Sequence, residues 1–244
     1  MQYWDLIARF GEVQILLPAA LLVALALLRR PETRALALLW ISSLSAALVL
    51  TTASKVAFIG WGIGWPELNF TGISGHAMVA AAVYPLLLGS LASHATRPGR
   101  AAAVGVGCAM ALLVGVSRVA LGAHSASEVL AGLCVGGAAS AIALDGARFV
   151  RALINPAVPA AVALWLALTP GLAPASQTHS AVTRLSLVLS GREVPYTRND
   201  MIEELAAYPL RYPRMNVAGA THRHSVDECA ARDIIRRLEP RARR

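Results

Sequence analysis

The stretch Ser117–Glu128, SRVALGAHSASE, lies between two long apolar runs and carries three ionisable side chains. Ionisable groups at the edge of a hydrophobic span cost free energy to place, so they indicate function. If the chain is helical from His124, then His124 and Glu128 lie one turn apart on one face. The carboxylate can then bind one ring nitrogen and leave the other nitrogen basic. Arg118 adds a planar fork of donors suited to phosphate, so the stretch holds the parts needed to attack phosphorus.

The composition of the whole chain is that of a membrane protein. Its 244 residues are 56% hydrophobic and 15% charged, with a mean hydropathy of +0.56. Apolar runs near the ~20 residues that cross a bilayer occur at residues 13–28, 35–54, 77–93, 101–116, 125–145 and 152–170. A water-soluble bundle would need a polar outer surface, which these runs lack. The pattern predicts an all-α, polytopic bundle of about six transmembrane helices.

Arginines mark the loops expected in the cytoplasm. They follow the first, third and fifth runs, as the positive-inside rule requires: Arg29, Arg30, Arg34, Arg97, Arg100, Arg148 and Arg151. Both termini should then face the other side, which is the periplasmic side of a bacterial inner membrane. The net charge of +8 comes mostly from such loops and the C-terminal tail, so no nucleic-acid partner is expected. The three isolated cysteines indicate neither a disulfide framework nor a zinc site.

A second polar cluster precedes the third run. Ser74-Gly75-His76 has the form of a helix start, with serine as the N-cap and free backbone N–H groups that favour anions. Lys55, the only lysine, ends the second run. The predicted topology brings Lys55 and His76 to the same membrane face as Arg118 and His124, opposite the arginine-rich loops. Snorkelling to headgroups would account for the cations but not for the histidines.

The chain resembles the PAP2 family of phosphatases in the order of its motifs, which are a lysine, then SGH, then SR-x5-H-x3-Glu. The superfamily also contains vanadium-dependent haloperoxidases. The resemblance covers Lys55–Glu128. It implies that His124 forms a phosphohistidine and that His76 protonates the leaving oxygen. Glu128 stands where the family usually has an aspartate that orients the nucleophile.

The resemblance also implies which groups hold the phosphoryl oxygens: Lys55, Ser74, Gly75, Arg118 and, beside it, Ser117. Neither a metal nor another cofactor is implied. One departure concerns the first motif, a lysine, six residues and then Arg-Pro, because Gly62 and Ile63 stand in the last two positions. We hypothesise that Arg192 or Arg198 replaces the missing guanidinium; the alternative is that both bind headgroups or pair with nearby acids.

These observations predict a membrane phosphatase with its catalytic domain at residues 1–170 and an extramembrane tail at 171–244. The tail should contain a short hairpin at residues 184–198, RLSLVLSGREVPYTR. The substrate should be a lipid with a phosphate or pyrophosphate headgroup, because a site at the membrane face lets the tail stay in the bilayer. The alternatives are a lipid phosphotransferase, a lipid-phosphate-binding protein without turnover and, as the weakest, a haloperoxidase.

Four local expectations complete the prediction. The glycines of the fifth run, Gly132, Gly136 and Gly137, should serve close helix packing. The segment 56–73 should be a loop anchored by tryptophans at the interface. The first ten residues should form a short interfacial helix. His222 and His224 are a weak candidate for a metal pair, because no further ligands accompany them.

Overall fold

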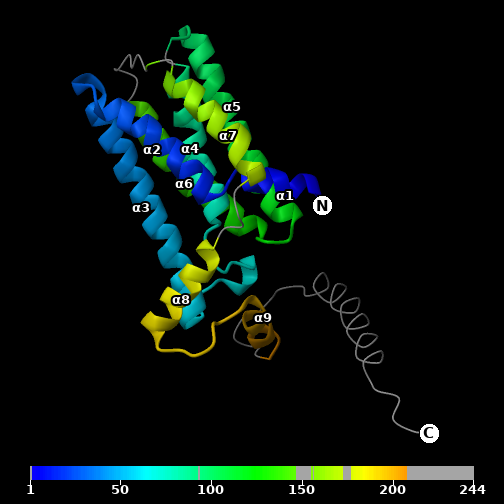
Figure 1. The fold of residues 1–244 in the computed structure, drawn as a ribbon. Helices are drawn as coiled ribbons and strands as arrows, with labels where there is room; N and C mark the ends of the chain where they lie inside the picture. Colours follow the sequence, from blue (N-terminus) through cyan, green and yellow to red (C-terminus); the bar gives the residue numbers. More distant parts are fainter. Residues whose placement is uncertain (1, 93, 147–154, 156, 173–176, 208–244) are drawn as a thin grey trace. The chain divides into compact units, whose positions relative to one another are not determined.

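The structure, a computed structural model, describes residues 2–92, 94–146, 155, 157–172 and 177–207. Within these ranges the chain is helical and contains no β-strand, which confirms the all-α class. The elements follow one another as α1 (Gln2–Arg9), α2 (Val13–Leu28), α3 (Pro31–Trp61), the 3₁₀ turn η1 (Pro66–Leu68), α4 (Gly75–Leu91), α5 (Arg97–Ala120), α6 (Ala126–Gly146), α7 (Ala157–Leu172), α8 (Thr178–Ser190) and α9 (Arg198–Ala207) (Figure 1). Met1–Met201 form one compact unit, and Ile202–Arg244 form a second. His222 and His224 lie outside the described residues.

The six predicted apolar runs correspond to α2 through α7. Among the described residues, four segments are long and apolar enough to cross a membrane: Tyr3–Leu28, Pro31–Trp61, Arg97–Ala120 and Ala126–Asp145. The helices α4 and α7 are apolar but shorter. The chain is therefore a helical membrane protein. The second run was expected to end near Lys55, but α3 continues to Trp61, because the helix stops only where Gly62 adopts a φ of 71°.

Helix α4 lies at the centre of its unit. Its side chains are almost all buried from Ala77 to Leu87, and it packs against α2, α3, α5 and α6. A helix surrounded by other helices is shielded from lipid, which agrees with the short length of α4. Its N-terminus, at Gly75, therefore lies among the ends of the neighbouring helices, where the predicted site residues are found.

Small residues allow α4 and α6 to approach closely. A Cβ atom on Gly132 would stand 2.6 Å from the carbonyl oxygen of Ser74, and one on Gly136 would overlap the carbonyl oxygen of Met78. The packing role predicted for these two glycines is confirmed. It is wrong for Gly137, where a Cβ would meet nothing within 4 Å, because only the first two lie one turn apart on the face toward α4.

Side-chain hydrogen bonds to backbone carbonyls tie the helices together. Trp40 donates from Nε1 to Ala82 at 3.1 Å and so joins α3 to α4. Trp165 of α7 donates to Ile15 of α2 at 2.9 Å, and the Tyr84 hydroxyl donates to Phe10 at 2.8 Å. In lipid the hydrophobic effect does not drive helices together, so packing and such bonds hold the bundle.

The hairpin predicted at residues 184–198 is wrong, because α8 is a helix that ends at Ser190. Ser186 and Ser190 recur one turn apart and face α3, where a Cβ on Gly60 would lie 3.1 Å from Cβ of Ser190. The alternating leucines suited a strand, but small residues every fourth position suit a helix packed on α3. The extramembrane location of residues from 171 onward stays a prediction, although α8 belongs to the same compact unit as the apolar helices.

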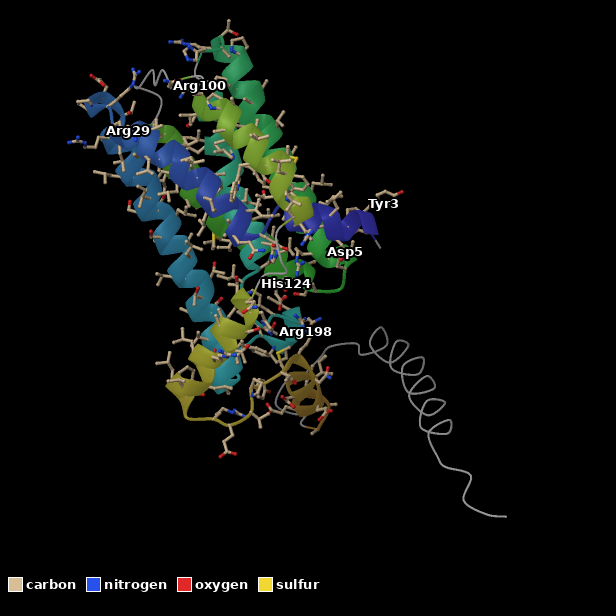
Figure 2. All side chains as sticks on the ribbon, viewed as in Figure 1. Tyr3, Asp5, Arg29, Arg100, His124 and Arg198 are labelled. Carbon is tan, nitrogen blue, oxygen red and sulfur yellow. The ribbon has the colours of Figure 1, made fainter. Side chains whose placement is uncertain are left out.

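Figure 2 shows Arg29 and Arg100 at one end of the apolar helices and His124 and Arg198 at the other. This separation agrees with the predicted topology, in which the arginine-rich loops and the site lie on opposite faces. Two further loop arginines, Arg148 and Arg151, lie outside the described residues.

Candidate active site

A cavity of about 630 Å³ brings together side chains from separate parts of the chain. Its walls come from α3, the start of α4, the end of α5, the α5–α6 turn, α8 and residues 195–198. Five of the predicted site residues line it: Lys55, Gly75, His76, Arg118 and His124. The structure therefore assembles residues that the sequence placed together only through the predicted topology.

A tight turn after α5 places His124 beside Arg118. Gly122 has a φ of 66°, a conformation that favours glycine. The turn folds the backbone N–H groups of Ala123 and His124 onto the carbonyl oxygen of Arg118, at 3.1 and 3.2 Å. Helix α6 begins at Ala126, so His124 lies just before the helix and Glu128 lies in its first turn.

His124 and Glu128 form the pair that their spacing predicted. Nδ1 of His124 lies 2.7 Å from Oε2 of Glu128, and the backbone N–H of Ser125 donates to the same oxygen at 3.1 Å. The Glu128 side chain is fully buried. Because the carboxylate accepts a hydrogen bond from Nδ1, the lone pair of His124 lies on Nε2.

Charges and burial around His124 act on its pKa in opposite directions. Burial lowers the pKa of His124, the hydrogen bond to Glu128 raises it, and the nearby cations Lys55 and Arg118 lower it. The result is a pKa below the usual value for histidine. At neutral pH the imidazole is therefore uncharged, which is the form that can act as a nucleophile.

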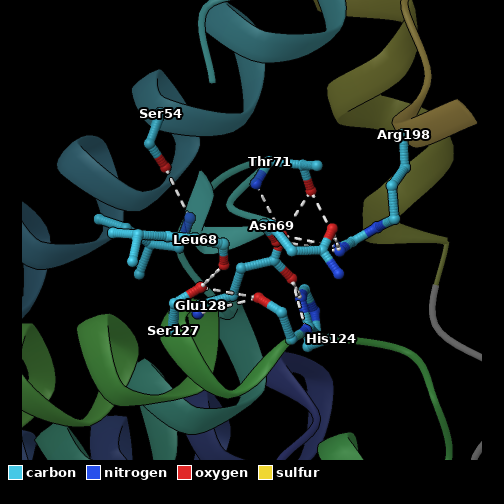
Figure 3. A network of polar contacts seen from close by, with 10 residues as sticks. Ser54, Leu68, Asn69, Thr71, His124, Ser127, Glu128 and Arg198 are labelled. Carbon is cyan, nitrogen blue, oxygen red and sulfur yellow. Dashed lines mark hydrogen bonds and ion pairs between the residues drawn. The ribbon is translucent and has the colours of Figure 1, made fainter. Parts of the chain in front are cut away.

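The second carboxylate oxygen of Glu128 has three donors of its own (Figure 3). Oε1 accepts from the backbone N–H of Thr71 at 2.7 Å, from its hydroxyl at 2.6 Å and from Nη2 of Arg198 at 2.7 Å. Thr71 was not among the predicted site residues, because a threonine in a glycine-rich loop carries no signal of such a contact. Glu128 thus connects the α6 start to the loop after α3.

Three buried polar atoms have no hydrogen-bond partner among the described residues: Thr51 Oγ1, Ser74 Oγ and Arg118 Nε. Thr51 and Arg118 line the cavity, and Ser74 precedes the lining residue Gly75. Ser74 holds the N-cap position of α4, but its side chain makes no capping bond. Unpaired buried polar groups are costly, so a ligand in the cavity could supply the missing partners of Thr51 and Arg118. Thr51 was also missed; its place one turn before Lys55 on α3 was the available signal.

Ser117 does not join the other predicted residues. It is fully buried, and its hydroxyl donates to the carbonyl oxygen of Val114 at 2.6 Å within α5. The side chain is absent from the cavity wall. A serine beside Arg118 on a helix faces a different direction, so proximity in sequence did not bring it to the cavity.

The C-terminal segment occupies the space beside Gly62, where the first motif lacks its arginine. A Cβ on Gly62 would lie 3.3 Å from the ring of Tyr196, whose N–H donates to the carbonyl oxygen of Ile59 at 2.9 Å. Arg198, two residues later, lines the cavity. This agrees with the hypothesis that Arg192 or Arg198 reaches the site. Arg192 lies instead over the Tyr196 ring, with its guanidinium carbon 5.8 Å from the ring centroid.

Fold and site together define an α-helical membrane protein with a histidine–carboxylate pair at a cationic cavity. The PAP2 superfamily matches residues 55–149. A protein from Klebsiella pneumoniae described as "Uncharacterized 22.5 kDa protein in cps region" is 43% identical over 141 residues, which cover 58% of this chain and 68% of that protein. No solved structure matches. The chain belongs to the PAP2 superfamily, whose members are generally phosphatases.

Proposed function

We propose that this protein hydrolyses the phosphate or pyrophosphate headgroup of a membrane lipid through a phosphohistidine on His124. The observation that carries the proposal is the cavity itself. It combines a histidine oriented by a buried carboxylate with Lys55 and Arg118. A positioned nucleophile and a cationic clamp are what phosphoryl transfer requires, since the transferring group spreads its charge over its oxygens.

In the first step, Nε2 of His124 attacks phosphorus and an N–P bond forms. The bond from phosphorus to the leaving oxygen breaks, and His76 gives that oxygen a proton. The Glu128 carboxylate stabilises the positive charge that develops on the imidazole. Lys55, Arg118 and the N-terminus of α4 hold the phosphoryl oxygens.

In the second step, water attacks phosphorus and gives a proton to His76. The N–P bond breaks, phosphate leaves, and both histidines return to their starting forms. Splitting hydrolysis at a nucleophilic histidine replaces one difficult step with two easier ones.

An apolar groove supports a lipid as the substrate. It has a volume of about 420 Å³, lies between α2 and α3 and is lined by residues such as Leu17, Leu21 and Trp40. Leu48 lines both this groove and the polar cavity. A hydrocarbon tail in the groove would leave the attached headgroup within the cavity. The arginine-rich loops and the site lie at opposite ends of the helices (Figure 2). Because such loops usually face the cytoplasm, this favours a site at the periplasmic face of the inner membrane.

The test is phosphate release by the purified protein from a panel of phosphatidic acid, a phosphatidylglycerophosphate and a polyprenyl pyrophosphate. We expect release from at least one of them and none by His124→Ala. Equal activity of this variant would refute the phosphohistidine, and binding without release would favour a lipid-binding protein. With a labelled donor and an acceptor lipid, label in a new lipid rather than in inorganic phosphate would identify a phosphotransferase.

A further inference from the structure

Arg198 reaches the site from the C-terminal segment, which the PAP2 match at residues 55–149 does not include. The segment is fixed on both sides of this arginine. Tyr196 packs edge-on against Phe58 of α3, with ring centroids 5.4 Å apart. The carboxylate of Asp200 accepts from the N–H and the hydroxyl of Thr197, at 2.7 and 2.8 Å, at the start of α9. The Arg198 side chain therefore extends from an anchored backbone.

The guanidinium of Arg198 makes four hydrogen bonds to the described residues, and none of them is with a phosphate-holding group (Figure 3). Nη1 donates to the carbonyl oxygen of Asn69 at 3.0 Å and to its Oδ1 at 2.5 Å. Nη2 donates to the Thr71 hydroxyl at 3.2 Å and to Oε1 of Glu128 at 2.7 Å. The two terminal nitrogens of arginine carry four N–H groups, so these acceptors use all of them.

The partner that matters for chemistry is Glu128. A fully buried carboxylate in an apolar helix is stable only if it is paired and hydrogen-bonded. Arg198 supplies the opposite charge at Oε1, while Oε2 remains bound to His124. The cation therefore lies on the far side of the carboxylate from the histidine.

We propose that Arg198 is a positioning residue, which fixes Glu128 and balances its charge so that His124 is held with Nε2 uncharged and ready to attack. The inference rests on the proposed function. It differs from the hypothesis that Arg198 replaces the missing phosphate-binding arginine, because its terminal nitrogens are committed to Glu128 and the 69–71 loop.

The experiment compares Arg198→Gln and Arg198→Lys with the wild type on a soluble short-chain phosphate ester. For Arg198→Gln we expect kcat to fall about 10- to 100-fold, the usual effect of losing a group that orients a functional histidine, while KM and the inhibition constant of vanadate stay unchanged. Arg198→Lys should recover part of kcat, since an ammonium restores the charge. Arg192→Ala, from the same segment, is the matched control and should behave as the wild type.

A pH titration separates positioning from a merely structural role. The ionisable groups that act on His124 are Glu128, Lys55 and Arg118, and His124 in turn acts on His76. Without Arg198 the Glu128 charge is unbalanced and holds a proton on His124 more tightly, so the acid limb of kcat/KM should move to higher pH. NMR of isotope-labelled histidine in the full-length protein measures the same shift in His124 without any turnover, so the inference is tested even if no substrate is hydrolysed.

Three results would overturn the proposal. A vanadate inhibition constant that rises with the loss of kcat would make Arg198 a phosphate ligand. Loss of activity on lipid substrates but not on the soluble ester would make it a headgroup ligand. An unshifted His124 titration in Arg198→Gln would exclude the charge balance. If that variant does not fold, Arg198→Met, which keeps an apolar stem without the charge, should shift the titration in the same direction, and no shift there would overturn the proposal equally.

Discussion

At the residue scale, two serines that look alike in the sequence have opposite surroundings. The hydroxyl of Ser74 is buried at the start of α4 and has no hydrogen-bond partner in the part of the chain that the structure describes, whereas that of Ser117 is bonded within α5. Ser74→Ala should lower kcat/KM by roughly 10- to 1000-fold if the hydroxyl contacts a phosphoryl oxygen in the transition state, with no loss of thermal stability. Ser117→Ala should leave the kinetics unchanged. Equal kinetics for both variants would mean that Ser74 does not contact the substrate.

The pH dependence follows from the surroundings of His124. Burial and two cations lower its pKa, against the hydrogen bond to Glu128 that raises it. Because the uncharged form of His124 is the nucleophile, activity should rise with pH through this pKa, and it should fall again at higher pH, where His76 has lost the proton that it gives to the leaving oxygen. We expect the acid limb of kcat/KM below about 6.5, the ordinary value of histidine. An acid limb near pH 8 would show that the carboxylate dominates and contradict the lowered pKa.

Residue identities and spacing were sufficient to predict the His124–Glu128 pair and the meeting of Lys55, His76 and Arg118. They were insufficient for Thr51 and Thr71, which are common residues whose role depends on what faces them. Ser117 shows the converse error, since a residue next to Arg118 in the chain lies on a different face of the helix. The order of the spans indicates which helix ends share a membrane face, but the side chains that a distant loop brings to the site are not readable from sequence.

At the element scale, the close contact between α4 and α6 fixes the position of the N-terminus of α4 at the site. Gly136→Ala would drive a methyl group into the carbonyl of Met78, and such overpacking typically costs about 1–3 kcal/mol. Gly137→Ala is the matched control, because its Cβ meets nothing and alanine favours a helix by up to about 1 kcal/mol. Thermal unfolding in detergent should show a lower midpoint only for Gly136→Ala. Equal midpoints would mean that the two helices separate easily.

The ends of elements were harder to predict than their existence. Residues 56–73 were predicted to form a loop, yet Gly60 lies inside α3, and Ser190 of α8 packs against it. The alternating leucines of the α8 sequence suited a strand. Packing against α3 decided in favour of the helix, and that packing depends on residues more than 100 positions away.

At the scale of the whole molecule, hydropathy was sufficient to predict an all-α membrane bundle, because the length and apolar composition of each run indicate by themselves a helix that crosses the bilayer. The role of the C-terminal segment could not be predicted this way. Arg198 and Glu128 are 70 positions apart, and Arg198 and Asn69 are 129 apart. The sequence offered two arginines for the site, and only the fold distinguishes Arg198 in the network from Arg192 outside it.

The orientation of the molecule is the last prediction. Ile63 is 66% exposed in the loop after α3, close in sequence to the site loop, while Arg29 lies at the opposite end of the helices (Figure 2). The positive-inside rule assigns the Arg29 end to the cytoplasm. In a background without the native cysteines, Ile63→Cys should react with a membrane-impermeant maleimide at the outer face of the inner membrane, and Arg29→Cys only after the membrane is opened. Phosphate release checks that both variants remain folded. The reverse labelling pattern would place the site in the cytoplasm, where a lipid phosphate of the inner leaflet would be the substrate.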